Sequence, residues 1–398
     1  MINDISVRKI IDSRGNPTVE AEVYTQTGYG RFSSPSGAST GEYEVVAFVD
    51  GNVDKTIEVA EARLIKELVG MDVFDQRGID ETLHEIDGTD NFSAIGGNLA
   101  VAVSIACAKA AAAALEIPLY LYAGGRFARS LPLPFGNVLG GGRHAVGGTD
   151  IQEYLAISTA PRLVDRVFGN AAVHRRVKDI LRERFRNEAI GKGDEGAWVA
   201  KLGNEEALDL VKKACDDVSD SVGFRVRIGL DFAASEFYRD GVYVYREKKR
   251  DRDEQISFVS ELVDRYELYF VEDPMDENDF DGFSELTRDV GKKMLICGDD
   301  LFVTNKSRLI KGIELGAGNC VLIKPNQVGT LSDTADTVSL ARKNGYATVV
   351  SHRSGETEDS AIAHLAMAFS STGIKCGAVG GERTTKLNEL IRLEEEIS

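Results

Sequence analysis

The chain has 398 residues, of which 43% are hydrophobic, and its formal net charge is −17. A chain of this length can bury a substantial core, in roughly two domains. The negative charge argues against general nucleic-acid binding, which needs a basic face. It remains compatible with an anionic substrate in a locally basic pocket.

The five cysteines are scattered along the chain without paired spacing. This pattern favours reduced, buried thiols over disulfides or a zinc site. The first residues lack the basic and apolar pattern of a signal peptide, and no apolar run reaches the ~18 residues of a membrane-spanning helix. We therefore expect a cytoplasmic protein without a membrane-spanning segment.

The first part of the chain, residues 1–125, mixes strand and helix patterns. Residues 5–11 and 18–25 are typical of two strands joined by a turn, and residues 58–68 have helical periodicity. Residues 100–114 are dominated by alanine and predict a helix that packs closely against a neighbour. We expect these elements to form an α+β domain.

The second part, residues 131–398, predicts a barrel of alternating strands and helices. Two strand candidates, 135–139 and 152–157, precede helical sequence at 162–187. Six further apolar runs end, directly or after one small residue, on Asp231, Glu272, Asp299, Lys324, His352 and Lys375, with spacings of 41, 27, 25, 28 and 23 residues. These spacings are typical of repeated βα units, and two plus six strands predict an eight-stranded (β/α) barrel.

The residues at the ends of these runs predict an active site, because the strand ends of such a barrel meet at one mouth. The carboxylates of Asp231, Glu272 and Asp299 suit a hard divalent cation such as Mg²⁺. A single aspartate after a strand often caps the next helix, but capping is a weaker explanation for carboxylates at three successive strand ends. Lys324 follows an apolar strand, where burial and neighbouring cations would lower its pKa and make it a usable base.

Three glycine-rich segments, 36–41, 140–150 and 191–196, are candidates for lids over a bound substrate, and each is equally compatible with an ordinary solvent loop. The second contains His144, which is mobile and accessible there. The third contains Glu195, for which a capping or surface role is the alternative.

The remaining histidines carry less information about function. His84 and His174 lie in charged helical stretches, so we expect both to be solvated. His364 lies in an apolar stretch and is expected to pack within a helix. By contrast, His352 is followed by Arg353 and Ser354, and the three offer adjacent donors for a phosphate or carboxylate.

Motifs along essentially the whole chain resemble those of the enolase family. They are DSRGNPTVE at 12–20, PSGASTG at 35–41, GDEG at 193–196, LDFAASEFY at 230–238, VEDP at 271–274, GDDLFVTN at 298–305, SHRSGETED at 351–359 and KLNELIRLEEE at 386–396. SHRSGETED alone is far more specific than a short glycine motif. The resemblance implies an α+β capping domain followed by a barrel of ββαα(βα)₆ type, which agrees with the pattern described above.

The resemblance also implies site residues for the Mg²⁺-dependent conversion of 2-phosphoglycerate to phosphoenolpyruvate. Lys324 would be the base and Glu195 the acid. One Mg²⁺ would be bound by Asp231, Glu272 and Asp299, and Ser39 would close onto a second. The residues implied to contact substrate or to line its pocket are His144, Gln152, Glu153, Glu272, Asp299, His352, Arg353, Ser354 and Lys375.

The chemistry of this reaction explains such a set of residues. Removal of the C2 proton places a second negative charge on an ionised carboxylate, and Lys375 and two Mg²⁺ ions can stabilise the dianion. Lys324 would accept the proton as a neutral amine, and Glu195 would protonate the departing hydroxyl. The enolase superfamily is itself the standard example of a lysine or histidine base used with Mg²⁺.

The chain differs from the family pattern beside these residues and not at them. The differences are Ala197 and Trp198 after GDEG, Arg143 and Val146 near His144, Pro325 after Lys324, and Cys376 and Val379 after Lys375. The resemblance further implies a homodimer or a ring of dimers.

Two alternatives remain open from the sequence. A related barrel could act on another 2-substituted carboxylate, although the phosphate-directed residues argue against it. A paralogue with low activity or a binding role would be expected to lack Lys324, Glu195 or a metal carboxylate, and all are present.

Overall fold

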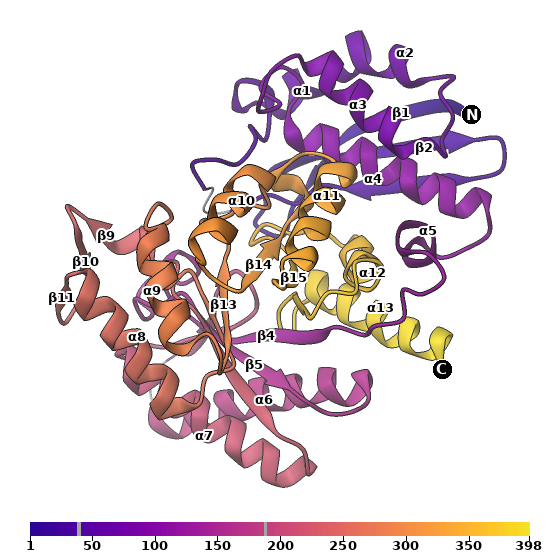
Figure 1. The fold of residues 1–398 in the computed structure, drawn as a ribbon. Coiled ribbons are helices and arrows are strands. Elements are labelled where there is room, and N and C mark those ends of the chain that lie inside the picture. The colour runs from indigo at the N-terminus through magenta and orange to yellow at the C-terminus, as the bar shows by residue number, and fades with distance from the viewer. Residues whose placement is uncertain (38–40, 187–188) are drawn as a thin grey trace.

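The computed structural model describes residues 1–37, 41–186 and 189–398 (Figure 1). Its N-terminal part is a three-stranded antiparallel sheet with helices against it. The strands β1 (Ile2–Ile11), β2 (Pro17–Thr25) and β3 (Tyr29–Ser33) pair in that order. The first two match the predicted strands, and β3 was not predicted.

The alanine-rich helix α4 (Gly97–Ala114) packs directly on this sheet, as the sequence predicted. A Cβ atom added at Gly30 would lie 2.0 Å from the carbonyl oxygen of Ala106, and one at Gly28 would lie 2.2 Å from that of Ala110. Glycines on and just before β3, together with alanines on α4, therefore allow the two backbones to approach closely. Of the described helices, α4 alone has the length and hydropathy of a membrane span, and 83% of it is buried within the protein.

The other N-terminal helices lie against the same domain in Figure 1. They are α1 (Val53–Val59), α2 (Ile65–Leu68), α3 (Gln76–Asp87) and α5 (Leu119–Gly124), with a π-helical turn at Ala60–Leu64 between α1 and α2. The predicted helix at 58–68 therefore lies within a longer helical segment that contains one π turn.

Eight strands close the barrel, in agreement with the predicted fold class. They are β4 (Leu133–Gly140), β5 (Glu153–Ser158), β8 (Val226–Asp231), β12 (Phe270–Glu272), β13 (Leu295–Gly298), β14 (Cys320–Ile323), β15 (Ala347–Ser351) and β16 (Gly373–Lys375). Neighbouring strands pair in this order, and β16 pairs with β4 to complete the ring.

Helices surround this ring of strands (Figure 1). Two of them, α6 (Leu163–Arg184) and α7 (Asn204–Val222), lie between β5 and β8 in the chain, which gives the ββαα start of the barrel. The later helices are α8 (Arg252–Tyr266), α9 (Phe280–Val290), α10 (Lys306–Leu315), α11 (Leu331–Lys343), α12 (Ala361–Ala368) and α13 (Gly381–Ile397). A small separate sheet, β9 (Tyr238–Arg239), β10 (Val242–Val244) and β11 (Lys249–Arg250), precedes α8.

Strand β5 runs antiparallel to both of its neighbours. Its first residue, Glu153, is the register partner of Asp231 at the end of β8 and of Gly140 at the end of β4. The beginning of β5 therefore lies at the mouth where the parallel strands end. This reversal brings Gln152 and Glu153 to the same place as the strand-end charges.

The segment with Glu195 is the turn of a short hairpin that extends the barrel sheet. Strands β6 (Gly191–Lys192) and β7 (Trp198–Val199) pair antiparallel, and β7 joins β4 through Trp198 and Leu139. We call residues 191–199 the acid hairpin. One of the predicted glycine-rich lid segments is thus partly strand and is tied to the barrel by backbone pairing.

An apolar cluster fills the barrel interior, and all five cysteines are free and buried, as expected. The cluster consists of Phe135, Leu155, Ile157, Phe270, Cys297, Cys320, Leu322 and Val349. With apolar side chains in the interior, the charged groups are left at the end of the strands that forms the mouth.

Candidate active site

A cavity at the barrel mouth brings together the predicted site residues that the structure describes. It is lined by His144, Gln152, Glu153, Glu195, Asp231, Glu272, Asp299, Lys324, His352, Arg353, Ser354 and Lys375, together with Gly37 and Ser351. The remaining predicted residue, Ser39, lies outside the described residues.

The buried ammonium group of Lys375 lies among three buried carboxylates. Its Nζ atom is 3.0 Å from Asp231 Oδ2, 2.8 Å from Glu272 Oε2 and 3.2 Å from Glu153 Oε1. Burial alone would lower the pKa of Lys375, but these carboxylates outweigh it and raise the pKa well above its usual value. Lys375 is therefore a fixed positive charge in the floor of the cavity.

Negative charge is nevertheless in excess around Glu272. Burial and the neighbouring Asp231 raise the pKa of Glu272 well above its usual value, because the ionised form is disfavoured there. Asp231, Glu272 and Asp299 supply only oxygen donors, and a divalent cation would relieve their repulsion. The residues present therefore fit a divalent metal.

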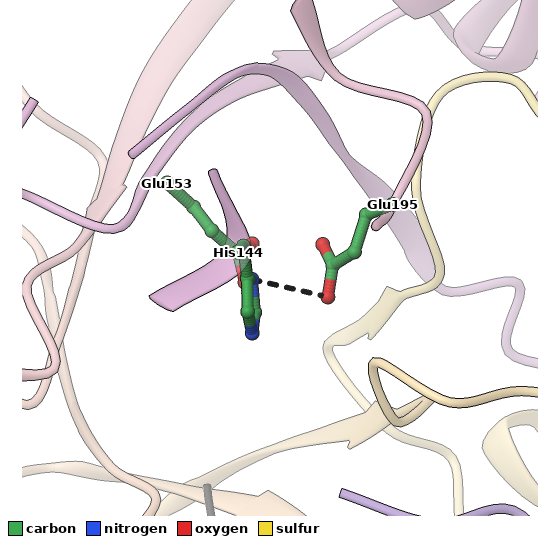
Figure 2. A group of neighbouring side chains, drawn as sticks. All are labelled: His144, Glu153 and Glu195. Atoms are coloured by element: carbon green, nitrogen blue, oxygen red, sulfur yellow. Dashed lines mark ion pairs between the residues drawn. The ribbon is translucent and has the colours of Figure 1, made fainter. Parts of the chain in front are cut away.

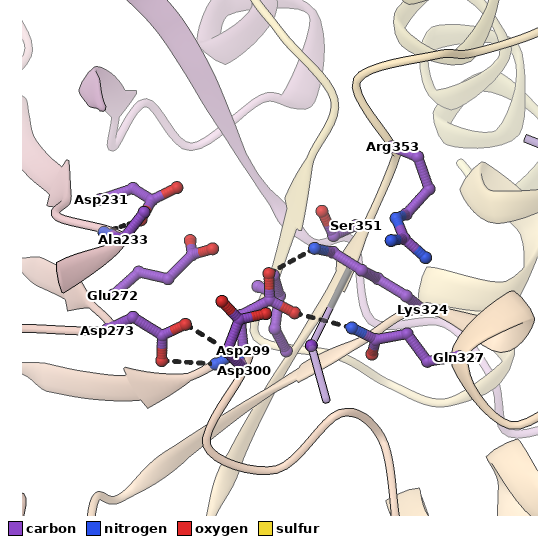
Figure 3. Close-up of polar contacts among 12 residues, drawn as sticks. Asp231, Ala233, Glu272, Asp273, Asp299, Asp300, Lys324, Gln327, Ser351 and Arg353 are labelled. Carbon is purple, nitrogen blue, oxygen red and sulfur yellow. Dashed lines mark hydrogen bonds and ion pairs between the residues drawn. The ribbon is translucent and has the colours of Figure 1, made fainter. Parts of the chain in front are cut away.

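The three predicted ligands are not clustered as tightly as two other groups. Among the residues that the structure describes, two groups of three have potential ligand atoms within 4.8 Å of one another. One group is Asp273, Asp299 and Asp300, and the other is His144, Glu153 and Glu195. The space near the predicted ligands is instead occupied by ammonium groups. Lys375 contacts Asp231 and Glu272. Lys324 contacts Asp299, as Figure 3 shows.

The ammonium group of Lys324 makes a short contact with Asp299 Oδ2 (Figure 3). Burial and the neighbouring cations lower the pKa of Lys324, but the carboxylates of Asp299 and Glu272 raise it, and the net direction is upward. The expectation of a lowered pKa was therefore wrong, because it did not include the carboxylate against the amine. On its other oxygen, Asp299 accepts a hydrogen bond of 3.0 Å from Gln327 Nε2.

Glu195 is buried at the tip of the acid hairpin, which excludes the surface or capping role considered above. Asn137 Nδ2 donates to Glu195 Oε2 over 3.1 Å. Glu195 Oε1 is 3.6 Å from His144 Nδ1, as Figure 2 shows, and it is 3.2 Å from His352 Nε2. Burial would raise the pKa of Glu195, but the facing histidines and Arg383 lower it well below its usual value.

His144 links the acid hairpin to the beginning of β5. Its Nδ1 atom lies 3.3 Å from Glu153 Oε1 as well as near Glu195. Burial lowers the pKa of His144, but these two carboxylates more than compensate and raise it. A proton can therefore be shared among three buried groups on this side of the cavity (Figure 2).

His174 was predicted to be solvated, and this prediction was wrong. The ring is buried, and its Nε2 atom is 2.8 Å from the carbonyl oxygen of Gly196. The indole of Trp198 donates to the carbonyl of His174 over 2.9 Å, and the two rings lie 5.2 Å apart. Burial lowers the pKa of His174 to about 4. The charged neighbours of His174 in the sequence suggested an exposed helix, but one face of α6 packs against the acid hairpin.

The other two histidines outside the cavity are His84 and His364. His84 is exposed beside Asp333, and His364 on α12 pairs with Glu389.

Several residues at this site were not singled out from the sequence. Asp273 accepts the backbone N–H groups of Asp299 and Asp300 over 2.9 and 2.8 Å, with its own backbone in the left-handed region at φ 40°. Its position directly after Glu272 was the available signal. Glu44 binds Arg353 over 3.0 Å, and only the tertiary structure could show that contact, because 309 residues separate the two.

The comparisons with known proteins agree with this geometry. The family description "Enolase, N-terminal domain" matches residues 2–123, and "Enolase, C-terminal TIM barrel domain" matches residues 128–398. An enolase of Methanothermobacter thermautotrophicus is 53% identical over 403 residues, covering 100% of this chain and 97% of the relative. An enolase of Natronomonas pharaonis is 54% identical and one of Archaeoglobus fulgidus 52%, each over 99% of this chain. With two family descriptions spanning almost the whole length, this chain belongs to the enolase family.

Proposed function

We propose that this chain catalyses the reversible dehydration of 2-phosphoglycerate to phosphoenolpyruvate, with Lys324 as base and Glu195 as acid. The observation that carries the proposal is that Lys324, Glu195 and Lys375 line one cavity together with three carboxylates that suit a divalent metal. Lys324 reaches the cavity from the end of β14, and Glu195 reaches it from the acid hairpin. A proton acceptor and a proton donor on separate elements suit this reaction, because one proton is removed from C2 and another is delivered to the hydroxyl group that leaves from C3.

The substrate would be held through its two anionic groups. We assign the carboxylate to the neighbourhood of Lys375 and the phosphate to Arg353, Ser354 and His352. Arg353 and Lys375 are buried cations, and a buried guanidinium is well suited to bidentate binding of phosphate. Because Glu44 already binds Arg353, an incoming phosphate would compete with that carboxylate or join it.

We propose that the divalent metal is Mg²⁺ and that two ions act in each site. Asp231, Glu272 and Asp299 would hold one, and Ser39 with the substrate phosphate would hold the other. The metal ions would supply electrostatic stabilisation of the second negative charge that develops on the substrate carboxylate. For Lys324 to act as a neutral amine, the charge of Asp299 must be engaged by a cation other than Lys324, because that contact now favours the ammonium form.

On the acid side, Glu195 must carry a proton when the hydroxyl departs. The neighbouring His144 and Glu153 are buried titratable groups that can supply this proton to Glu195. Asn137 holds the other oxygen of Glu195, so that Oε1 faces the histidines. We therefore assign Glu195 Oε1 as the atom that transfers the proton.

Further expectations accompany this proposal. We propose that the chain divides into a capping domain over 1–125 and a catalytic barrel over 131–398. We also propose a homodimer or a ring of dimers, a cytoplasmic location, and a small phosphorylated carboxylate as the substrate.

The test is to add 2-phosphoglycerate and Mg²⁺ to the purified protein and to follow absorbance in the enol-phosphate band. Steady growth that stops on addition of a chelator and resumes with excess Mg²⁺ is the expected result. Calorimetric binding of 2-phosphoglycerate without any product would overturn the proposal and would indicate a binding paralogue.

A further inference from the structure

The fully buried guanidinium group of Arg383 lies against His352, on the side away from Glu195. Arg383 is in the first turn of α13, and its exposed fraction is 0%. Its Nη1 atom lies 2.8 Å from His352 Nδ1 and donates to the carbonyl oxygen of Arg353 over 2.7 Å. Its Nη2 atom donates to the carbonyl oxygen of Ser354 over 2.8 Å. One side chain thus holds three consecutive residues that line the cavity.

This contact determines where the His352 ring carries its proton. A guanidinium group has only N–H donors and keeps its charge at all ordinary pH values. The Nδ1 atom of His352 must therefore accept the hydrogen bond, which leaves the single ring proton on Nε2. Burial lowers the pKa of His352 to about 3, and the positive charge of Arg383 beside the ring acts in the same direction, so the ring stays neutral.

The Nε2–H group defined in this way faces the proposed acid. Nε2 of His352 lies 3.2 Å from Glu195 Oε1, and the ring is buried. Within the part of the chain that the structure describes, this nitrogen has no well-aligned hydrogen-bond partner. A buried donor is seldom left without a partner unless a ligand or a moving group satisfies it. The donor is therefore available to Glu195 and to a group bound beside it.

Arg383 also approaches the acid hairpin directly. Its Nη2 atom lies 3.4 Å from the carbonyl oxygen of Asp194, the residue before Glu195. The same guanidinium thus contacts the ring that faces the acid and the turn that presents the acid. A substitution at Arg383 can therefore affect Glu195 through the His352 ring and through the backbone of Asp194.

We infer that Arg383 is a positioning residue of the dehydration, which fixes His352 as the Nε2–H tautomer and so provides a directed N–H donor to the Glu195 carboxylate. This inference rests on the proposed role of Glu195 as acid. In the opposite tautomer, an Nε2 lone pair would face the carboxylate oxygen and repel it. Control of a histidine tautomer by the partner of its other nitrogen is a recognised means of orienting catalytic groups.

A purely structural role is the competing explanation, because Arg383 also satisfies buried carbonyl groups. The chain offers a matched control in Lys386, one turn further along α13. Lys386 is a buried cation that donates to the carbonyl of Thr357 and lies 3.5 Å from Glu356 Oε1. It supports the same segment of the chain without contacting His352. Arg383→Met and Lys386→Met, which each replace a buried cation by methionine, therefore separate tautomer control from general support of the segment.

The direct measurement is nitrogen NMR of protein labelled only in its histidines, of which there are five. Comparison with His352→Gln assigns the resonances of His352. The wild-type spectrum is expected to show an unprotonated Nδ1 and a protonated Nε2, and Lys386→Met should retain that pattern. Arg383→Met, which removes the donor to Nδ1, should convert His352 to a mixture of tautomers. A wild-type spectrum with the proton on Nδ1, or on both nitrogens, would overturn the inference even if the enzyme is active.

Kinetics supply the second test. Arg383→Met should lower kcat by about 10–100-fold, the range typical when the outer partner that orients a ligating histidine is lost. In a His352→Gln background, the same substitution should have little further effect, because the group through which it acts is absent. An equal loss in both backgrounds would mean that Arg383 acts only on the fold. Absence of product from the wild-type enzyme would count against the proposed function and leave the NMR result on Arg383 standing by itself.

Discussion

Glu195 Oε1 and His352 Nε2 lie 3.2 Å apart, although the two residues come from the acid hairpin and from the end of β15. Lys324 reaches the same cavity from β14. The proposed acid and base therefore belong to separately anchored elements. Each can be removed without displacing the other, and this makes their roles separable by experiment.

The first prediction separates the base from the acid. With Lys324→Ala, the C2 proton of 2-phosphoglycerate should neither exchange with deuterated water nor be eliminated, because no acceptor remains. With Glu195→Gln, exchange at C2 should persist while product formation falls by roughly 10²–10⁴-fold, as is typical for loss of one general acid. Loss of the C2 proton signal by NMR and product absorbance are measured in parallel. Exchange in the lysine variant combined with none in the glutamine variant would show that the two roles are reversed.

The second prediction concerns Asp299, which we propose as a metal ligand. Asp299→Asn keeps the shape of the side chain but removes a charged oxygen donor, so Mg²⁺ affinity should fall and turnover should be lost. Titration calorimetry measures the affinity, and circular dichroism should show an unchanged fold. The exposed Asp289→Asn variant changes the net charge equally and should bind Mg²⁺ like the wild type. If Asp299→Asn also retains wild-type affinity, Asp299 is not a ligand.

The third prediction follows from the buried, neutral His174. Its pKa is about 4 in the folded protein, against 6.5 for an unperturbed histidine side chain, so the unfolded state binds the proton more readily. Stability should therefore be complete above pH 6.5 and should decrease as the pH falls toward 4, with a slope of up to about 1.4 kcal/mol per pH unit from this group. His174→Gln retains a donor for the Gly196 carbonyl. In this variant, the slope of the unfolding free energy against pH should be smaller by up to about 1.4 kcal/mol per pH unit, which corresponds to one proton.

The control for this measurement is His84, whose pKa is shifted in the opposite direction. The hydrogen bond to Asp333 raises the pKa of His84, so its contribution is present below pH 6.5 and is lost as the pH rises through the folded value. Urea unfolding across the pH range should therefore show changes of opposite sign in His84→Gln and His174→Gln. Identical slopes in His174→Gln and the wild type would contradict the buried, neutral state of His174.

The fourth prediction concerns the close packing of α4 on β3. In Gly30→Ala, the new methyl group would meet the Ala106 carbonyl, so strand and helix must move apart at a cost of about 1–3 kcal/mol. Thermal unfolding measures this loss. Gly381→Ala is the matched control, because no atom lies within 4 Å of the added carbon at that position. Equal melting temperatures for Gly30→Ala and the wild type would mean that the interface can adjust without cost.

The sequence by itself determined the fold class and the positions of the charged strand ends. A strand buried on both faces must be apolar until it reaches the mouth, so the first charge after Val321 to Ile323 marks the end of β14 at Lys324. The same argument located Asp231, Glu272 and Lys375. Local periodicity was sufficient for these elements because burial acts on each strand separately.

Only the tertiary structure decided which charges meet and in which state they are held. Lys375 and Asp231 are 144 residues apart, and no local pattern predicts that the ammonium group will lie between the carboxylates of Asp231 and Glu272. The reversal of β5, which brings Glu153 to the mouth, is equally absent from periodicity, because a buried strand has the same pattern in either direction. The burial of His174 and the raised pKa of Lys324 have the same origin. Both depend on neighbours supplied by distant segments, and electrostatic and desolvation energies are set by those distances and not by the order of residues along the chain.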